Sequence, residues 1–125
     1  MKNKILYHRT KWDNAQQILS EGFRVKTEGH RIESGAGVYC VTSLEDANRP
    51  YNKKHYGNTI IAIEVSNDLL WEYGSKVEFM NRSKKGDKHG NRIYPSVTTG
   101  TVAVLYNIEA ILSIKISRDN GKTWL

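Results

Sequence analysis

The chain has little cysteine and no long hydrophobic run, and these absences exclude several classes of protein. Cys40 is the only cysteine in 125 residues, so the chain cannot form an internal disulfide or a cysteine-rich metal site. The longest apolar stretch, Thr59 to Val65, is far shorter than the roughly 20 residues of a transmembrane helix. No signal-type apolar segment follows Met1. We therefore expect a cytoplasmic protein with no metal site and no membrane contact.

Proline and glycine are also scarce. The chain has 2 prolines and 10 glycines, and 38% of its residues are hydrophobic, so its composition is neither of low complexity nor typical of disorder. Its length suits one compact core but not two, and it contains no repeat or linker. The sequence predicts a single domain over residues 1–125.

Acidic residues are fewer than basic ones, 13 against 19, which gives a formal charge of +6. This charge favours an anionic partner, either a nucleic acid, a phosphorylated ligand or an acidic protein. Much of it lies in a segment from Lys76 to Arg92, which we interpret as a basic loop or long hairpin. The candidates for acceptor recognition there are Lys84, Lys85, Lys88 and Arg92. A solvated loop without a partner is the alternative interpretation.

Strand and helix signals alternate in the first third of the chain. Ile5 to Tyr7 is a short apolar run that predicts a strand ending at the polar His8–Thr10. A helix follows, with Asp13 placed to accept hydrogen bonds from its first turn and Gly22 as its stop. The stretch from Phe23 to Gly37 has no sustained period and is predicted to be a loop.

The middle of the chain repeats this alternation. Val38–Thr42 predicts a strand, and Ser43 is an N-cap for a second helix that Pro50 should end or kink. Thr59–Val65 is apolar at nearly every position, which predicts a buried strand in the middle of a sheet.

Two closing strands are predicted at Thr101–Tyr106 and Ile111–Ser117, with a turn between them. Asp119–Gly121 predicts a tight turn after which Trp124 folds back onto the body. Together these elements predict an α+β domain, mostly strands, with two short helices in the N-terminal half.

The order of these motifs resembles the catalytic domain of the poly- and mono-ADP-ribosyltransferases of the His-Tyr type. In this chain a first strand ends in His8 followed by Thr10, and a glycine turn at Gly35 and Gly37 leads into a strand that carries Tyr39. The resemblance covers the first half well and the last third more loosely. It implies a split, mostly antiparallel β-sheet and NAD as substrate.

The resemblance also implies roles for individual residues. The catalytic residues would be His8, which would bind a ribose hydroxyl, and Tyr39, which would stack on the nicotinamide ring. The backbone of Arg9 would pair with the nicotinamide carboxamide. The full set of implied NAD contacts is His8, Arg9, Thr10, Gly37, Tyr39 and Tyr51.

Two positions depart from the family pattern. Val102 stands where polymer-forming members carry a glutamate, and the nearby Glu109 falls in a turn. Chain elongation is therefore not expected, and single-unit transfer, NAD cleavage alone and NAD binding without catalysis all stay open. Arg9 replaces the usual glycine, so its side chain must point away from the nicotinamide.

The sequence thus favours an NAD-dependent mono-ADP-ribosyltransferase with a protein or nucleic-acid acceptor, for instance a toxin or a phage effector. The alternative is a non-catalytic module of the same fold that binds NAD, ADP-ribose or nucleic acid. Arg9 and Val41–Ser43 faintly resemble the toxin-type branch, but its Glu-x-Glu turn is missing. RNA 2′-phosphotransferase chemistry ranks last, because its arginine and histidine set has no counterpart that we can place.

Overall fold

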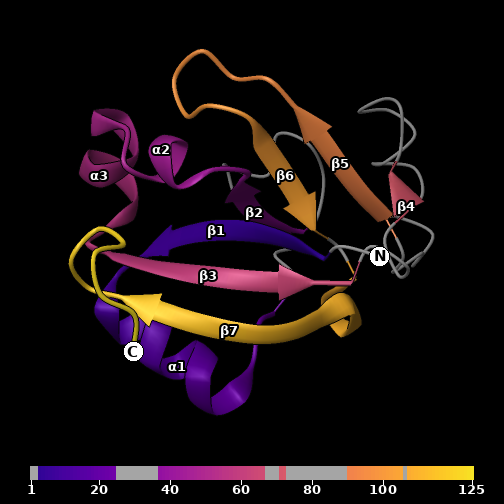
Figure 1. Cartoon of the computed structure of the whole chain (residues 1–125), viewed down its shortest axis with the longest axis horizontal. Coiled ribbons are helices and arrows are strands. Elements are labelled where there is room, and N and C mark those ends of the chain that lie inside the picture. Colours follow the sequence, from indigo (N-terminus) through magenta and orange to yellow (C-terminus); the bar gives the residue numbers. More distant parts are fainter. Residues whose placement is uncertain (1–2, 25–36, 67–70, 73–89, 106) are drawn as a thin grey trace.

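The computed structural model describes residues 3–24, 37–66, 71–72, 90–105 and 107–125. In these ranges seven strands form one sheet in the order β4-β5-β6-β2-β1-β3-β7 (Figure 1). The strands are β1 Lys4–Thr10, β2 Val38–Val41, β3 Thr59–Val65, β4 Trp71–Glu72, β5 Gly90–Tyr94, β6 Val102–Leu105 and β7 Ile111–Ser117. The helices are α1 Trp12–Glu21, α2 Leu44–Ala47 and α3 Pro50–Tyr56, with a 3₁₀ turn η2 at Ile108–Ala110. Only β4 and β5 pair in parallel, which confirms the predicted α+β class with a mostly antiparallel sheet.

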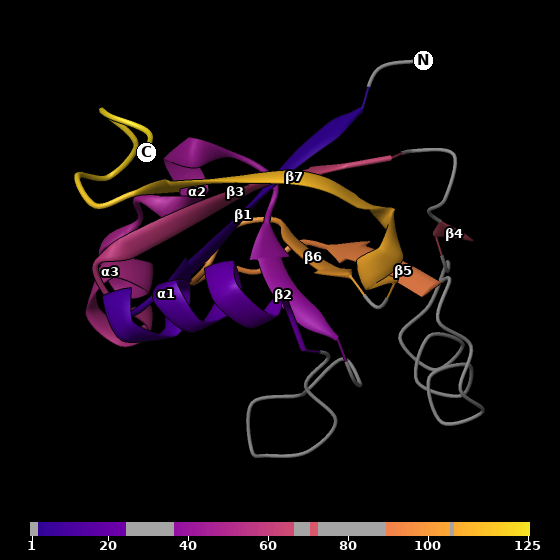
Figure 2. The same ribbon diagram turned by 90° about the horizontal axis from the view of Figure 1, so that it is seen from below.

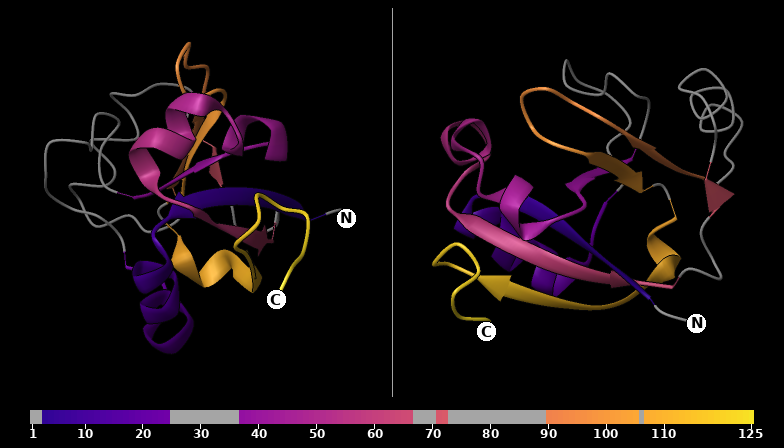
Figure 3. Two further views of the ribbon diagram at one scale, coloured as in Figure 1. Left: turned by 90° about the vertical axis from the view of Figure 1, so that its left-hand side faces the viewer. Right: turned by 45° about the horizontal axis from the view of Figure 1, so that its top comes forward.

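The sheet is nearly divided between β1 and β2. These strands pair only at Tyr7 and Val41, whereas β1 pairs with β3 along its whole length, from Lys4 to Thr10. We call β1, β3 and β7 the first half-sheet, and β2, β4, β5 and β6 the second half-sheet. Their strands diverge from the junction, as the right-hand view in Figure 3 shows.

The hydrophobic core lies on both faces of β3. On one face Ile61 and Ile63 are fully buried against Leu6 of β1 and Ala15 of α1. Figure 2 shows α1 lying along this side of the strands. On the other face Ile60 packs with α2 in a smaller cluster. The prediction of a buried strand at Thr59–Val65 is confirmed, because β3 has β1 and β7 as neighbours.

The C-terminal residues close the smaller cluster. Trp124 packs against it, with its ring centroid 6.4 Å from that of Tyr7. The chain turns back through Asn120 and Gly121, which both have positive φ angles. The predicted turn and the return of Trp124 are confirmed.

Helix boundaries differ from the sequence predictions in two places. α1 begins at Trp12 with Lys11 as N-cap, so Asp13 lies inside its first turn, while Gly22 ends it as predicted. Ser43 accepts a hydrogen bond from the N–H of Asp46 at 3.1 Å, as expected of a cap. Pro50, however, opens a separate helix α3, because proline fits the first turn, where no N–H donor is needed.

The predicted basic loop is described only at its C-terminal end. Lys84, Lys85 and Lys88 lie outside the described residues. Arg92 belongs to β5, a strand that the interpretation as a loop or long hairpin left open, and its guanidinium lies 4.3 Å from the centre of the Tyr94 ring. No helix in the described ranges is long and apolar enough to cross a membrane.

Candidate functional site

A cavity of about 980 Å³ opens where the two half-sheets diverge. Every residue that the resemblance connects with NAD lines it: His8, Arg9, Thr10, Gly37, Tyr39 and Tyr51. Val102 lines it as well. Its volume is at the upper end of the range for ligand pockets, about 300–1,000 Å³. The structure therefore brings the predicted NAD contacts together, whereas Arg92 is not part of the lining.

The cavity exists because β1 loses β2 as its neighbour after Tyr7. Beyond this residue β1 continues as His8, Arg9 and Thr10 along β3 alone. The backbone edge of these residues thus faces the gap between the half-sheets. An exposed strand edge offers N–H and C=O groups to a ligand that carries an amide.

His8 has a defined tautomer. Its Nδ1 lies 2.7 Å from the carbonyl oxygen of Tyr39, and since a carbonyl can only accept, Nδ1 carries the proton. The ring also meets the edge of Phe23, with centroids 5.6 Å apart. Burial lowers the pKa of His8 below its usual value, although the bond to Tyr39 acts in the opposite direction. The ring is therefore neutral at pH 7, and its Nε2 is an acceptor for a ligand hydroxyl.

The lowered pKa of His8 predicts a pH-dependent stability. In the unfolded chain His8 takes up a proton below pH 6.5, while the folded ring resists it, so the unfolded state is favoured as the pH falls. Compared with His8→Asn, the wild-type protein should lose up to about 1.4 kcal/mol of unfolding free energy between pH 7.5 and 5.5. Urea unfolding of both proteins at the two pH values measures this difference. A constant difference between them would contradict the lowered pKa.

The Arg9 side chain has a structural role, because it joins distant segments of the chain through hydrogen bonds. It is 8% exposed and donates to the carbonyl oxygens of Ala47 at 2.7 Å and Gly57 at 2.9 Å. Its Nη2 also donates to the side-chain oxygens of Asn48 at 2.8 Å and Asn120 at 3.0 Å. These bonds direct the guanidinium toward α2 and the C-terminal turn. The resemblance implies an Arg9 side chain that points away from the nicotinamide, and in the structure all four of these bonds hold the guanidinium on other segments of the chain.

One wall of the cavity is a group of rings on α3. Tyr51 and His55 have centroids 4.3 Å apart, and Tyr51 and Tyr56 have centroids 6.3 Å apart. All three line the cavity, and Tyr51 is 37% exposed. Flat faces of this kind suit an aromatic ligand, because stacked rings favour offset or tilted contacts at these distances.

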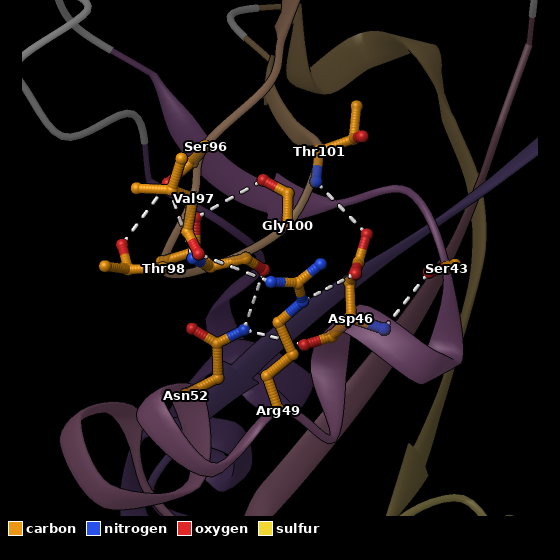
Figure 4. Close-up of polar contacts among 10 residues, drawn as sticks. Ser43, Asp46, Arg49, Asn52, Ser96, Val97, Thr98, Gly100 and Thr101 are labelled. Atoms are coloured by element: carbon orange, nitrogen blue, oxygen red, sulfur yellow. Dashed lines mark hydrogen bonds and ion pairs between the residues drawn. The ribbon is translucent and has the colours of Figure 1, made fainter.

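A second wall is the loop after β5, whose Ser96, Thr98 and Thr99 line the cavity. The Asp46 carboxylate holds this loop, because it accepts hydrogen bonds from Arg49 Nε at 2.9 Å and from the Thr101 N–H at 3.1 Å (Figure 4).

Asn52 adds to this anchor by donating to the carbonyl oxygens of Asp46 at 2.7 Å and Thr99 at 3.0 Å. Burial raises the pKa of Asp46, but the bonds from Arg49 and Thr101 outweigh it and hold the pKa below its usual value. Gly100 is required here, since its φ is +89° and a Cβ would lie 2.1 Å from Asp46 Cγ. Sequence reasoning did not identify this anchor.

No free carboxylate stands near Val102 in the described cavity. Val102 is buried in β6 between Val41 and Tyr94. The one carboxylate in the described lining is that of Glu21, which accepts from Gln17 at 3.1 Å and pairs with Arg24 at 3.2 Å.

The other reactive groups are accounted for in a similar way. Glu109 lies in η2 and is not part of the lining. Burial raises the pKa of the Cys40 thiol to about 12, so it stays protonated and is no nucleophile. In the described ranges no three histidine, cysteine or acidic side chains gather to bind a metal ion.

Compared with models of protein families and with curated proteins, the chain matches none. Its chemistry therefore follows from the cavity itself. The cavity offers a hydrogen-bond acceptor at His8, an edge of β1 at Arg9 that is not paired with β2, and the rings of Tyr39 and Tyr51. It can hold and orient a ligand with a ribose, an amide and a planar ring.

Proposed function

We propose that this protein is an NAD-dependent mono-ADP-ribosyltransferase, which transfers ADP-ribose from NAD to a macromolecular acceptor, a protein or a nucleic acid. The observation that carries the proposal is the meeting of His8, the Arg9 backbone, Tyr39 and Tyr51 in one cavity at the divergence of the half-sheets. These residues are far apart in the sequence, and the resemblance to ADP-ribosyltransferases assigns all of them to NAD.

The residues have separate tasks in the proposed reaction. The backbone of Arg9 holds the carboxamide of nicotinamide, Tyr39 stacks on its ring, and His8 Nε2 accepts a hydrogen bond from a ribose hydroxyl. The bond from the ribose C1′ to nicotinamide breaks, and its electron pair neutralises the pyridinium nitrogen. A nucleophile of the acceptor forms the new bond to C1′ from the opposite face and releases its proton to water. Nicotinamide leaves as a neutral molecule, so its departure needs no proton from an acid. Holding the reacting groups in a fixed orientation therefore supplies most of the rate enhancement.

Val102 supports transfer of one unit rather than a polymer. In the resembled family the glutamate at this position binds the second ribose and polarises the acceptor. A valine side chain can do neither, and the one carboxylate in the described lining, that of Glu21, is paired with Arg24.

Release of nicotinamide from NAD tests the proposal. The wild-type protein should release nicotinamide, measured by chromatography, and Tyr39→Ala should release it about 100-fold more slowly, because the ring is no longer held in a reactive orientation. Tyr39→Phe is the matched control, since it keeps the ring and should stay within about fivefold of wild type. Equal rates for Tyr39→Ala and wild type would indicate a contaminating enzyme. No release by wild type, even with cell lysate as acceptor, would refute the transferase.

A binding module is the second candidate, and Val102 is the observation that favours it. In that case NAD or ADP-ribose should bind in the cavity and raise the melting temperature without release of nicotinamide. Tyr39→Ala should remove this shift. The two candidates are thus separated by nicotinamide release, while both require binding in the same cavity.

A further inference from the structure

Helix α3 carries rings on one side and a lysine on the other. Tyr51, His55 and Tyr56 line the cavity described above. Lys53 lines a second, smaller groove. A single helix of seven residues therefore forms the boundary between an aromatic wall and a basic one.

The second groove has a volume of about 390 Å³ and lies between the start of α1 and the end of α3. The groove is lined by Lys11, Trp12, Asp13, Lys53, Gly57 and Asn58. Lys11 and Lys53 are exposed, and the Arg118 guanidinium, which is not part of the lining, lies 4.2 Å from the centre of the Trp12 ring. Asp13 is the one carboxylate in the described lining.

The groove and the cavity share their walls. Thr10 lines the cavity and the next residue, Lys11, lines the groove. Likewise Tyr56 lines the cavity and Gly57 lines the groove. The groove and the cavity are therefore adjacent, so a molecule bound in the groove lies beside the cavity.

We propose that this groove binds the backbone of a single-stranded nucleic acid, and that this nucleic acid is the acceptor of the transferred ADP-ribose. The exposed cations Lys11 and Lys53 complement the phosphates of its backbone. The exposed ring of His55, stacked on Tyr51 at the cavity, offers a face for an unpaired base. An acidic peptide would use the cations but would leave the ring face without a planar partner. A nitrogen or oxygen of the base would attack C1′ of the ribose and lose its proton to water as nicotinamide departs.

Binding is tested without NAD, so that it does not depend on the proposed function. The affinity of a labelled single-stranded oligonucleotide of about 12 nucleotides is measured by fluorescence anisotropy across a salt series. The double variant Lys11→Gln, Lys53→Gln should bind at least about tenfold more weakly at low salt. Its salt slope should fall by about 1.4, because each phosphate contact contributes about 0.7.

The matched control is the double variant Lys4→Gln, Lys115→Gln, which removes the same charge. Lys4 lies at the opposite end of β1 from Lys11, and Lys115 lies on β7. This control should keep its affinity within about twofold, since charges beyond a Debye length of about 10 Å are largely screened. Equal losses of affinity in both double variants would show that only the net charge of the protein matters, and would overturn the proposal.

A ring variant separates base stacking from charge. His55→Ala should weaken binding about fivefold or more with little change in the salt slope, because stacking on a ring is insensitive to salt. If a polyglutamate peptide competes as well as the oligonucleotide and His55→Ala has no effect, the occupant is an acidic protein and the proposal is wrong.

The acceptor role rests on the proposed function and is tested separately. Protein, NAD and oligonucleotide are incubated together, and the mass of the oligonucleotide should increase by one ADP-ribose unit. The Lys11→Gln, Lys53→Gln variant should lose this product but still release nicotinamide to water. Oligonucleotide binding without any nicotinamide release would refute the transferase and with it the acceptor role, and leave the binding surface standing. Nicotinamide release without modified oligonucleotide would refute the acceptor role alone.

Discussion

Arg9→Met is expected to lower the free energy of unfolding by about 3–5 kcal/mol. The substitution leaves the carbonyl oxygens of Ala47 and Gly57 without their donor, and each buried acceptor left unsatisfied costs about 1–3 kcal/mol. The bonds to Asn48 and Asn120 are lost as well, although these side chains can turn toward water. Because domains of this size are stable by only about 5–15 kcal/mol, the variant should be close to unfolding.

Urea unfolding followed by tryptophan fluorescence measures this loss. Arg118→Met is the matched control, because its exposed guanidinium contacts only the Trp12 ring among the contacts described and should cost about 1 kcal/mol or less. Arg9→Lys should fall between wild type and Arg9→Met, since a lysine keeps the charge but not the planar set of donors. A stability of Arg9→Met equal to that of Arg118→Met would show that the four bonds contribute little.

His8→Asn should reduce nicotinamide release about 100-fold or more while leaving the protein folded. The asparagine amide can still donate to the Tyr39 carbonyl in the place of Nδ1, but it has no acceptor at the position of Nε2. If the ribose is held through Nε2, its loss misplaces the reacting carbon, and a displacement of about 1 Å costs about 100-fold in rate.

His8→Gln provides the comparison. Its longer amide can place an oxygen acceptor near the position of Nε2, so this variant should retain more activity than His8→Asn but should be less stable, because the donor to Tyr39 is lost. The measurements are kcat/KM for nicotinamide release and the melting temperature of each variant. Wild-type activity in His8→Asn would remove His8 from the proposed machinery.

Helices and strands could be predicted from the sequence where a single local signal was strong. Thr59–Val65 is apolar at nearly every position and forms β3, and Ser43 caps α2 as expected. The sequence left open whether the segment that ends at Arg92 is a loop or a hairpin. Its run of charged residues is typical of a loop, while the pairing of β5 with β6 that stabilises the strand is nonlocal. The effect of Pro50 was harder to predict, because proline disrupts a helix interior but suits a first turn. The direction of the chain after Asn48 decides which of the two applies.

The candidate site was predictable in its residue types but not in its supports. The sequence named His8, Tyr39 and Tyr51, and the structure brings them to one cavity. It could not predict that Asp46 anchors the loop after β5, because residues 46 and 101 are far apart in the chain. For Arg9 the sequence analysis required only that the side chain point away from the expected nicotinamide position. Where that side chain ends depends on the C-terminal turn, which no local pattern near Arg9 specifies.

The single pair between β1 and β2 has a consequence for how the protein folds. The chain passes from one half-sheet to the other between β1 and β2, between β2 and β3, between β3 and β4, and between β6 and β7. Neither half is therefore a continuous stretch of sequence that can form first and wait for the other. Such long-range pairing raises the contact order, which slows folding. The cavity takes its lining from residues between Tyr7 and Val102, so a nascent chain that ends before β6 lacks part of its walls.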